Sequence, residues 1–206
     1  RNFVLVIILP AVLAWLLANK WPKYGLVCFI AVYAFCAIAF FALRHIDPGL
    51  DFPQAVVNKQ QAFIQLVGNS SIPIKQLQPD ILSFLKNTPQ AITLSAVRPY
   101  PSDVRHLLSL AAATETEIIL LLFLLFLFFR KKNTIHSKNV LYFCVFFSVS
   151  LLLSIGFSVN NLGAIVRYRS IIIPLLVGIM AVQTDWKIIA DFFTGKNKKN
   201  PATTAI

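Results

Sequence analysis

The fold of this chain is decided by a run of twelve apolar residues, IILLLFLLFLFF at Ile118–Phe129, which Arg130-Lys131-Lys132 follows at once. Twelve residues cannot cross a bilayer, because a helical span needs about 20 residues at about 1.5 Å each. Ser102-Asp103 is a helix-cap signal upstream, and neither Gly nor Pro lies between it and the run. We therefore predict a membrane-spanning helix from about Asp103 to Arg130, with the basic triplet at a membrane surface.

The rest of the 206-residue sequence agrees with a membrane protein. Hydrophobic residues make up 57% of it and charged residues 13%, whereas soluble domains carry about 25% charged residues. This composition excludes a soluble enzyme, a disordered chain and a disulfide scaffold. Four more segments are apolar and long enough to span: Asn2–Ala18 (broken by Pro10), Gly25–Leu43, Val140–Val159 and Ile165–Val182 (containing Pro174). We predict an all-α polytopic transmembrane helix bundle of about five spans.

Residues 44–102 differ from the apolar segments on either side. They hold seven of the eleven prolines, which excludes one long helix. Short amphipathic helices are expected from Pro53 to Gly68, after Pro79-Asp80, and from Thr88-Pro89, packed on the end of the bundle. The chain thus divides into two membrane helices (1–43), an external loop region (44–102), three membrane helices (103–183) and a basic tail (184–206).

The charge distribution predicts the orientation of the spans. The net charge is +11, yet residues 44–117 hold six basic and six acidic residues. The excess lies in segments 19–24 and 130–138 and in the tail, and Lys and Arg accumulate on the cytoplasmic side. We therefore predict a cytoplasmic C-terminus in a bacterial inner membrane. Five spans then leave the first residue outside, which predicts further helices before Arg1.

The sequence contains no signal for a nucleic-acid partner, a metal ion or a cofactor. Basic clusters interleaved with aromatic residues are absent outside the positions that flank the membrane segments, which argues against nucleic acid. The three cysteines lie inside apolar runs without metal or disulfide spacing. We expect no metal site and no cofactor.

Four charged residues fall near the outer membrane boundary. Glu115 and Glu117 lie roughly 22 and 20 Å from Arg130 along the predicted helix, and Arg167 and Arg169 connect the last two spans. Residues two apart on a helix point about 200° apart, so only one of each pair can face the bundle. We expect a Glu of the first pair to form an ion pair with an Arg of the second. The alternative is that these side chains only meet lipid headgroups.

The segment NLGAIVRYR at Asn161–Arg169, with Pro174 downstream, carries a resemblance. It resembles a pattern near the C-terminus of polytopic proteins from bacterial envelope-polysaccharide clusters and of polyprenyl-phosphate-sugar glycosyltransferases. AVRPYP at Ala96–Pro101, before a long helix, is similar in the same way. The resemblance implies cell-envelope glycan (polysaccharide) biosynthesis or export. Those glycosyltransferases keep a catalytic acid in a first external loop that this chain lacks, so the resemblance implies a C-terminal portion or a reduced relative and leaves enzymatic activity open.

On this hypothesis the protein handles a polyprenyl-phosphate-linked saccharide at the outer face of the membrane. The phosphate- or lipid-binding candidates are Arg167, Arg169, Arg98 and Arg105, and the catalytic candidates are Glu115 and Glu117. The expected partners are membrane lipid, the polyprenyl-phosphate-linked sugar and other membrane subunits. Two other functions stay open: a non-catalytic membrane subunit that packs along Ile118–Phe129 in a larger complex, and part of a transporter with helices broken at Pro10 and Pro174.

Overall fold

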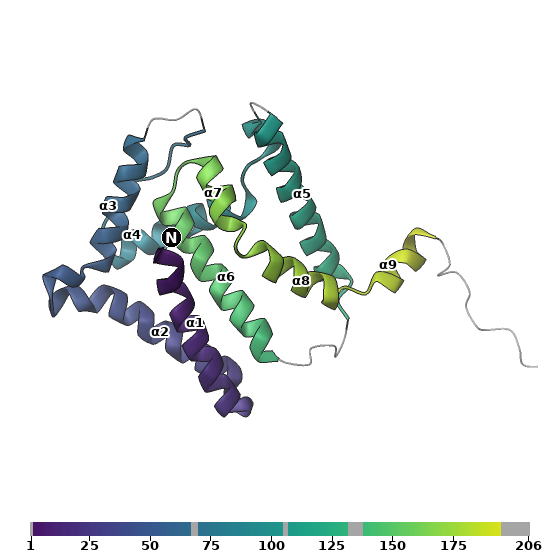
Figure 1. The fold of residues 1–206 in the computed structure, drawn as a ribbon, viewed down its shortest axis with the longest axis horizontal. Helices are drawn as coiled ribbons and strands as arrows, with labels where there is room; N and C mark the ends of the chain where they lie inside the picture. Colours follow the sequence, from purple (N-terminus) through teal and green to yellow (C-terminus); the bar gives the residue numbers. More distant parts are fainter. Residues whose placement is uncertain (1, 67–69, 105–106, 132–137, 195–206) are drawn as a thin grey trace, which may run out of the picture.

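The structure, a computed structural model, describes residues 2–66, 70–104, 107–131 and 138–194. In these ranges the regular elements are helices, which confirms the all-α class (Figure 1). The α-helices are α1 Asn2–Lys20, α2 Gly25–Ala42, α3 Phe52–Gln65, α4 Ile81–Ile92, α5 Leu107–Phe128, α6 Lys138–Ser158, α7 Leu162–Arg169, α8 Ile173–Gln183 and α9 Trp186–Phe193. The short turns are η1 Pro22–Tyr24, η2 Leu43–His45, η3 Pro48–Leu50, η4 Thr93–Val97 and η5 Pro101–Asp103.

Four helices in the described ranges are long and apolar enough to cross a membrane: α1, α2, α5 and α6. Helices α7 and α8 pass the same test only as a pair, with an angle of 56° between them, and would make a fifth span if the pair crosses the membrane. The segment Ile165–Val182, predicted as one membrane helix, is thus divided between two helices. Pro174 lies in the first turn of α8, where its missing N–H is tolerated, and the chain bends just before it.

Two other helices differ from the sequence prediction, one in its continuity and one in its start. Helix α1 continues through Pro10 instead of breaking there. Helix α5 starts at Leu107 and not at Asp103. Asp103 closes the η5 turn instead, because its Oδ2 accepts the backbone N–H of Tyr100 at 3.0 Å. The cap signal at Ser102-Asp103 thus belongs to a turn before the spanning helix.

Helix α6 is the centre of the bundle. In its most apolar stretch, 33% of the residues are buried, whereas the corresponding share is 11% in α2 and in α5. It packs against α1, α2, α3, α4, α7 and α8. Its residues Phe147, Leu151 and Ile155 form the main core with Ala11 of α1 and Ile165 of α7. In Figure 1, α1 and α2 lie on one side of α6, and α5 lies on the other side beyond α8.

Two close approaches hold the elements around α6. Ala11, Ala14 and Ala18 of α1 are fully buried, and such small side chains let membrane helices approach closely. At the other crossing, a Cβ added to Gly156 of α6 would overlap the backbone of Ala91 in α4. Glycine is therefore required where α4 crosses α6.

The loop region 44–102 packs against the bundle through α3 and α4. Phe84 of α4 contacts the rings of Phe40, Phe41 and Phe157 at centroid distances of 5.0 to 5.6 Å. The buried Gln60 of α3 donates from Nε2 to the carbonyl of Phe157 at 3.0 Å and accepts the N–H of Leu77 at 2.8 Å. Helices α3 and α4 of this region thus pack against α2 and α6.

The number of helices in this region differs from the prediction. The first two helices begin where the sequence predicted them, at Phe52-Pro53 and after Pro79-Asp80, and Asp51 and Asp80 cap them. The third helix expected at Thr88-Pro89 does not exist as a separate element, because both residues lie inside α4. The Thr88 hydroxyl donates to the Phe84 carbonyl at 2.8 Å, within the helix. Gly68, the expected end of the first helix, lies outside the described residues.

Candidate functional site

Arg169 is the most deeply buried of the candidate residues. It ends α7, and only 4% of it is exposed. Its Nη1 donates to the backbone carbonyls of Arg98 at 2.9 Å and Ala96 at 3.2 Å, with Ser95 more distant at 3.5 Å. Its Nη2 donates to the Thr116 hydroxyl of α5 at 2.7 Å. One side chain thus joins α7, α5 and the end of η4.

The predicted ion pair between this arginine and an acid of α5 is wrong. Glu115 attracts the guanidinium through space, but neither Glu115 nor Glu117 lies within 4.0 Å of Arg167 or Arg169. The carbonyls at the C-terminal end of η4 take the place of a carboxylate, since a helix C-terminus carries partial negative charge and unpaired acceptors. Helix α5 does meet Arg169, but through Thr116, the residue between the two acids.

Arg167 has the opposite environment. It is exposed, and its guanidinium lies over the Tyr168 ring, 5.2 Å from the ring centroid. The prediction that only one arginine of this pair faces the bundle is therefore confirmed. Arg169 is buried and its Nη1 and Nη2 bind protein groups, while its Nε is buried without a partner. Arg167 is therefore the arginine of α7 whose donors are accessible from outside.

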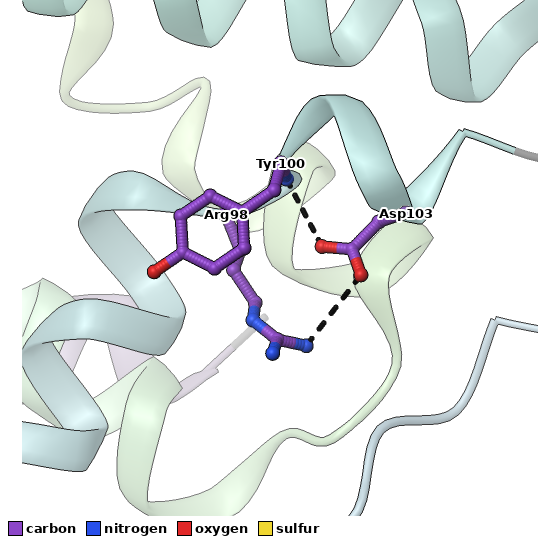
Figure 2. Close-up of polar contacts among 3 residues, drawn as sticks. All are labelled: Arg98, Tyr100 and Asp103. Carbon is purple, nitrogen blue, oxygen red and sulfur yellow. Dashed lines mark hydrogen bonds and ion pairs between the residues drawn. The ribbon is translucent and has the colours of Figure 1, made fainter.

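A hollow of about 430 Å³ with a mixed polar and apolar lining lies between η5, α5 and α7, and Arg98, whose carbonyl binds Arg169, is part of that lining. Arg98 and Asp103 line it and face each other, with Nη1 of Arg98 3.8 Å from Oδ1 of Asp103 (Figure 2). The Arg98 guanidinium also lies 5.1 Å from the centroid of the Tyr100 ring. The hollow therefore contains one cation that is held loosely by one acid.

Four serines are among the remaining lining residues: Ser70, Ser71, Ser102 and Ser109. The segment with Ser70 and Ser71 is held in place by Asn161, the residue before α7. An isolated antiparallel bridge pairs Ser71 with Asn161, and the Ser70 hydroxyl donates to Oδ1 of Asn161 at 3.2 Å. Residues about 90 positions apart in the sequence thus form one wall of the hollow.

A second, apolar groove of about 560 Å³ runs between α5 and α8. Leu110, Ile118 and Ile173 are typical of its lining, and Glu115 is its only charged lining residue. Glu115 is partly buried, whereas Glu117 is exposed and lines neither the groove nor the hollow. Of the two candidate acids, Glu115 is therefore the one placed at a cavity.

The hollow and the groove lie on adjacent faces of α5. Ala112 lines the hollow and Glu115 lines the groove, and residues three apart are neighbours on a helix surface. The hollow offers a cation and hydroxyl groups, which suit a phosphorylated or hydroxylated group. The groove offers apolar surface that faces lipid if α5 spans the membrane. Together they suit a molecule with a polar head and an apolar chain.

The candidate residues from the sequence differ in whether they lie at the two cavities. Arg98 lines the hollow, Glu115 lines the adjoining groove, and Arg169 supports the hollow from behind through the carbonyl of Arg98. Arg167 and Glu117 lie outside both cavities, and Arg105 lies outside the described residues. Among the described residues, no group of three His, Cys, Asp or Glu side chains could hold a metal ion.

The sequence did not identify Ser70, Ser71 or Asp103 as residues of a site. Asp103 has a local signal, since an acid two residues after Pro101 suits a turn. Ser70 and Ser71 have none, because only their bridge to Asn161 places them at the hollow. No protein-family model, curated protein or solved structure matches this chain.

Proposed function

We propose that this chain is part of a multi-pass membrane protein that binds a polyprenyl-phosphate-linked saccharide at the outer face of a bacterial inner membrane, in cell-envelope glycan biosynthesis or export. The observation that carries the proposal is the hollow lined by Arg98, which adjoins the apolar groove along α5. An amphiphilic ligand needs a polar site beside apolar surface, and both are present along one helix.

In this proposal Arg98 binds the phosphate. Its Nη1 is 3.8 Å from Asp103, longer than a charge-assisted hydrogen bond of about 2.7–2.9 Å. A phosphate oxygen that approaches Arg98 could therefore form a shorter bond than the one it replaces. Asp103 and the serine hydroxyls would then hydrogen-bond to sugar hydroxyls, and the isoprenoid chain would follow the groove past Glu115.

The charge pattern supports placing the hollow at the outer face. The hollow lies at the end of the bundle that carries α3 and α7. The described basic residues Lys20, Lys23, Arg130 and Lys131 lie at the other ends of α1 and α5. The basic segments are expected on the cytoplasmic side. A saccharide in the hollow would then be outside the cytoplasm.

The proposal is tested with a photoreactive polyprenyl monophosphate added to the purified chain in lipid nanodiscs. We expect saturable cross-linking to residues of the hollow or the groove, and much weaker cross-linking by the matching polyprenol. Replacing Arg98 with Gln should weaken binding about tenfold or more, as the loss of a charge-assisted hydrogen bond implies.

Lys86→Gln is the matched control for this experiment. Lys86 is an exposed cation on α4 and does not line the hollow, so its loss changes the net charge equally and should leave binding unchanged. Equal binding by the Arg98→Gln and Lys86→Gln variants would contradict the role of Arg98. Equal cross-linking by the phosphate and the polyprenol would contradict the proposed ligand class.

A second candidate function is a non-catalytic subunit of a larger membrane complex. It is favoured by α5, whose main contacts are with α8 and η5 and whose apolar residues Ile118, Leu121 and Leu127 are exposed. This function requires no ligand in the hollow. Loss of complex assembly on substitution of Leu121 and Leu127, without any binding of polyprenyl phosphate, would support it over the first proposal.

A further inference from the structure

Helix α9 has an apolar face that the rest of the described structure leaves uncovered. At about 100° per residue, Lys187 and Asp191 form a narrow polar wedge, and the other six positions are apolar. Of these, Ile189 is buried, but Trp186 and Ile188 are 46% and 48% exposed. In Figure 1, α9 runs away from the bundle and across the direction of α5. Trp186 and Ile188 therefore present apolar surface that the described residues leave exposed.

The position of α9 relative to the spans indicates what covers it. The end of α5 is joined to the end of α8 by backbone hydrogen bonds from Lys131 to the Gln183 carbonyl at 2.8 Å and from Asp185 to the Phe129 carbonyl at 2.7 Å. The basic residues Arg130 and Lys131 follow α5 there, as is typical of a membrane boundary. We call these two hydrogen bonds, between residues 129–131 and 183–185, the clasp. Helix α9 begins at Trp186, one residue after the clasp, so it begins at the membrane boundary.

The start of α9 is fixed at this level. The Asp185 carboxylate caps α9 by accepting the N–H groups of Lys187 and Ile188. The indole Nε1 of Trp186 donates to the Ala181 carbonyl of α8 at 2.8 Å. Tryptophan is enriched at membrane interfaces, where its ring meets the acyl chains and its N–H is satisfied.

The charge of this region indicates the kind of lipid. Lys187 is exposed on the polar wedge of α9, and the sequence continues with Lys196, Lys198 and Lys199. Asp185 is used as the helix cap, which leaves Asp191 as the acid on the wedge. Lysines near an anionic membrane surface add electrostatic attraction to it.

We infer that α9 lies in the plane of the membrane interface and binds anionic lipid, with Trp186 and Ile188 in the acyl boundary and Lys187 among the headgroups. The partner is therefore a lipid surface that contains anionic headgroups. This inference depends on α9 and its clasp alone, and it holds whatever ligand binds the hollow at the opposite end of α5.

Trp186 itself provides the probe. In the Trp15→Phe, Trp21→Phe double variant, Trp186 is the only tryptophan, since the chain has three. The full chain is reconstituted in nanodiscs of phosphatidylcholine with a minority of phosphatidylglycerol, and one of the two lipids is brominated close to the headgroup. We expect quenching of Trp186 fluorescence, and quenching per brominated lipid about twofold or more stronger for phosphatidylglycerol.

The Lys187→Gln variant should lower that ratio, and Lys23→Gln, which removes an exposed cation before α2, should leave it unchanged. An absence of quenching by both lipids overturns the interfacial placement and indicates that α9 faces water or another protein. Equal quenching by both lipids overturns the assignment of anionic lipid. If the double variant does not fold, the difference between the native chain and Trp186→Phe isolates the same signal.

Discussion

At the scale of single residues, Arg169 shows how this protein accommodates a buried charge without an acid. Its Nη1 and Nη2 donate to the backbone carbonyls around η4 and to the Thr116 hydroxyl. These carbonyls lie at the end of η4, where backbone oxygens have no donor within the helix. The arginine thus satisfies acceptors that would otherwise be buried and unpaired, which is costly in an apolar environment.

Replacing Arg169 with Met should lower the free energy of unfolding by about 3–5 kcal/mol, because several buried acceptors lose their donor at once. Thr116→Val removes one of these hydrogen bonds and should cost about 1–2 kcal/mol. Equilibrium unfolding of the purified chain in mixed micelles measures both. Arg167→Met, at the exposed arginine, is the control and should stay within about 0.5 kcal/mol of the wild type.

The same measurement distinguishes the observed contacts from the ion pair that the sequence suggested. Glu115 forms no ion pair with Arg169, so Glu115→Gln should cost much less than Thr116→Val. A Glu115→Gln variant as unstable as the Arg169→Met variant would show that the acid, and not the carbonyls, balances the arginine.

At the scale of elements, the crossing of α4 and α6 depends on Gly156. A Cβ at this position would overlap the carbonyl of Ala91, which belongs to the backbone and cannot move aside alone. In contrast, a Cβ at Gly178 of α8 would meet nothing within 4 Å. We therefore expect replacement by alanine to have opposite effects on stability at the two positions.

Gly156→Ala should lower the free energy of unfolding by about 1–3 kcal/mol, as overpacking does. Gly178→Ala should raise it by about 0.5–1 kcal/mol, because alanine loses less backbone entropy in a helix. Thermal unfolding of the two variants in one detergent tests both signs. Destabilisation of equal size at both positions would show that the close approach of α4 to α6 is not what Gly156 provides.

At the scale of the whole molecule, the charge distribution predicts which end of the bundle lies outside. In cells that carry the chain, Lys86→Cys on α4 should react with a membrane-impermeant maleimide from outside. Lys23→Cys, before α2, should react only after the membrane is permeabilised, because the basic segments are expected inside. The native cysteines lie within the predicted spans, and the wild-type chain gives their background.

Labelling of Lys23→Cys in intact cells, without labelling of Lys86→Cys, would reverse the orientation. It would place the hollow beside Arg98 on the cytoplasmic side and exclude a saccharide at the outer face. The inference about α9 would survive that result, because the clasp between α5 and α8 puts α9 at a membrane boundary on either side.

The sequence alone determined what depends on neighbours along the chain. The apolar runs require lipid around them, and they predicted the spans α1, α2, α5 and α6. The caps at Asp51, Asp80 and Asn161 bind N–H groups two or three residues away, so their role is local and readable. Several element boundaries failed at this level: the segment Ile165–Val182 is divided between α7 and α8, α5 begins at Leu107, and Thr88-Pro89 lies inside α4.

The tertiary structure decided the partners of the polar residues. Arg169 meets Arg98 and Thr116, which are 71 and 53 positions away, and Ser70 meets Asn161, which is 91 positions away. The charges of Glu115 and Glu117 suggested the nearest opposite charge as their partner, but a guanidinium donates to any well-placed oxygen, charged or neutral. Which oxygen is well placed depends on how α4, α5 and α7 pack together, and that geometry is a property of the whole bundle.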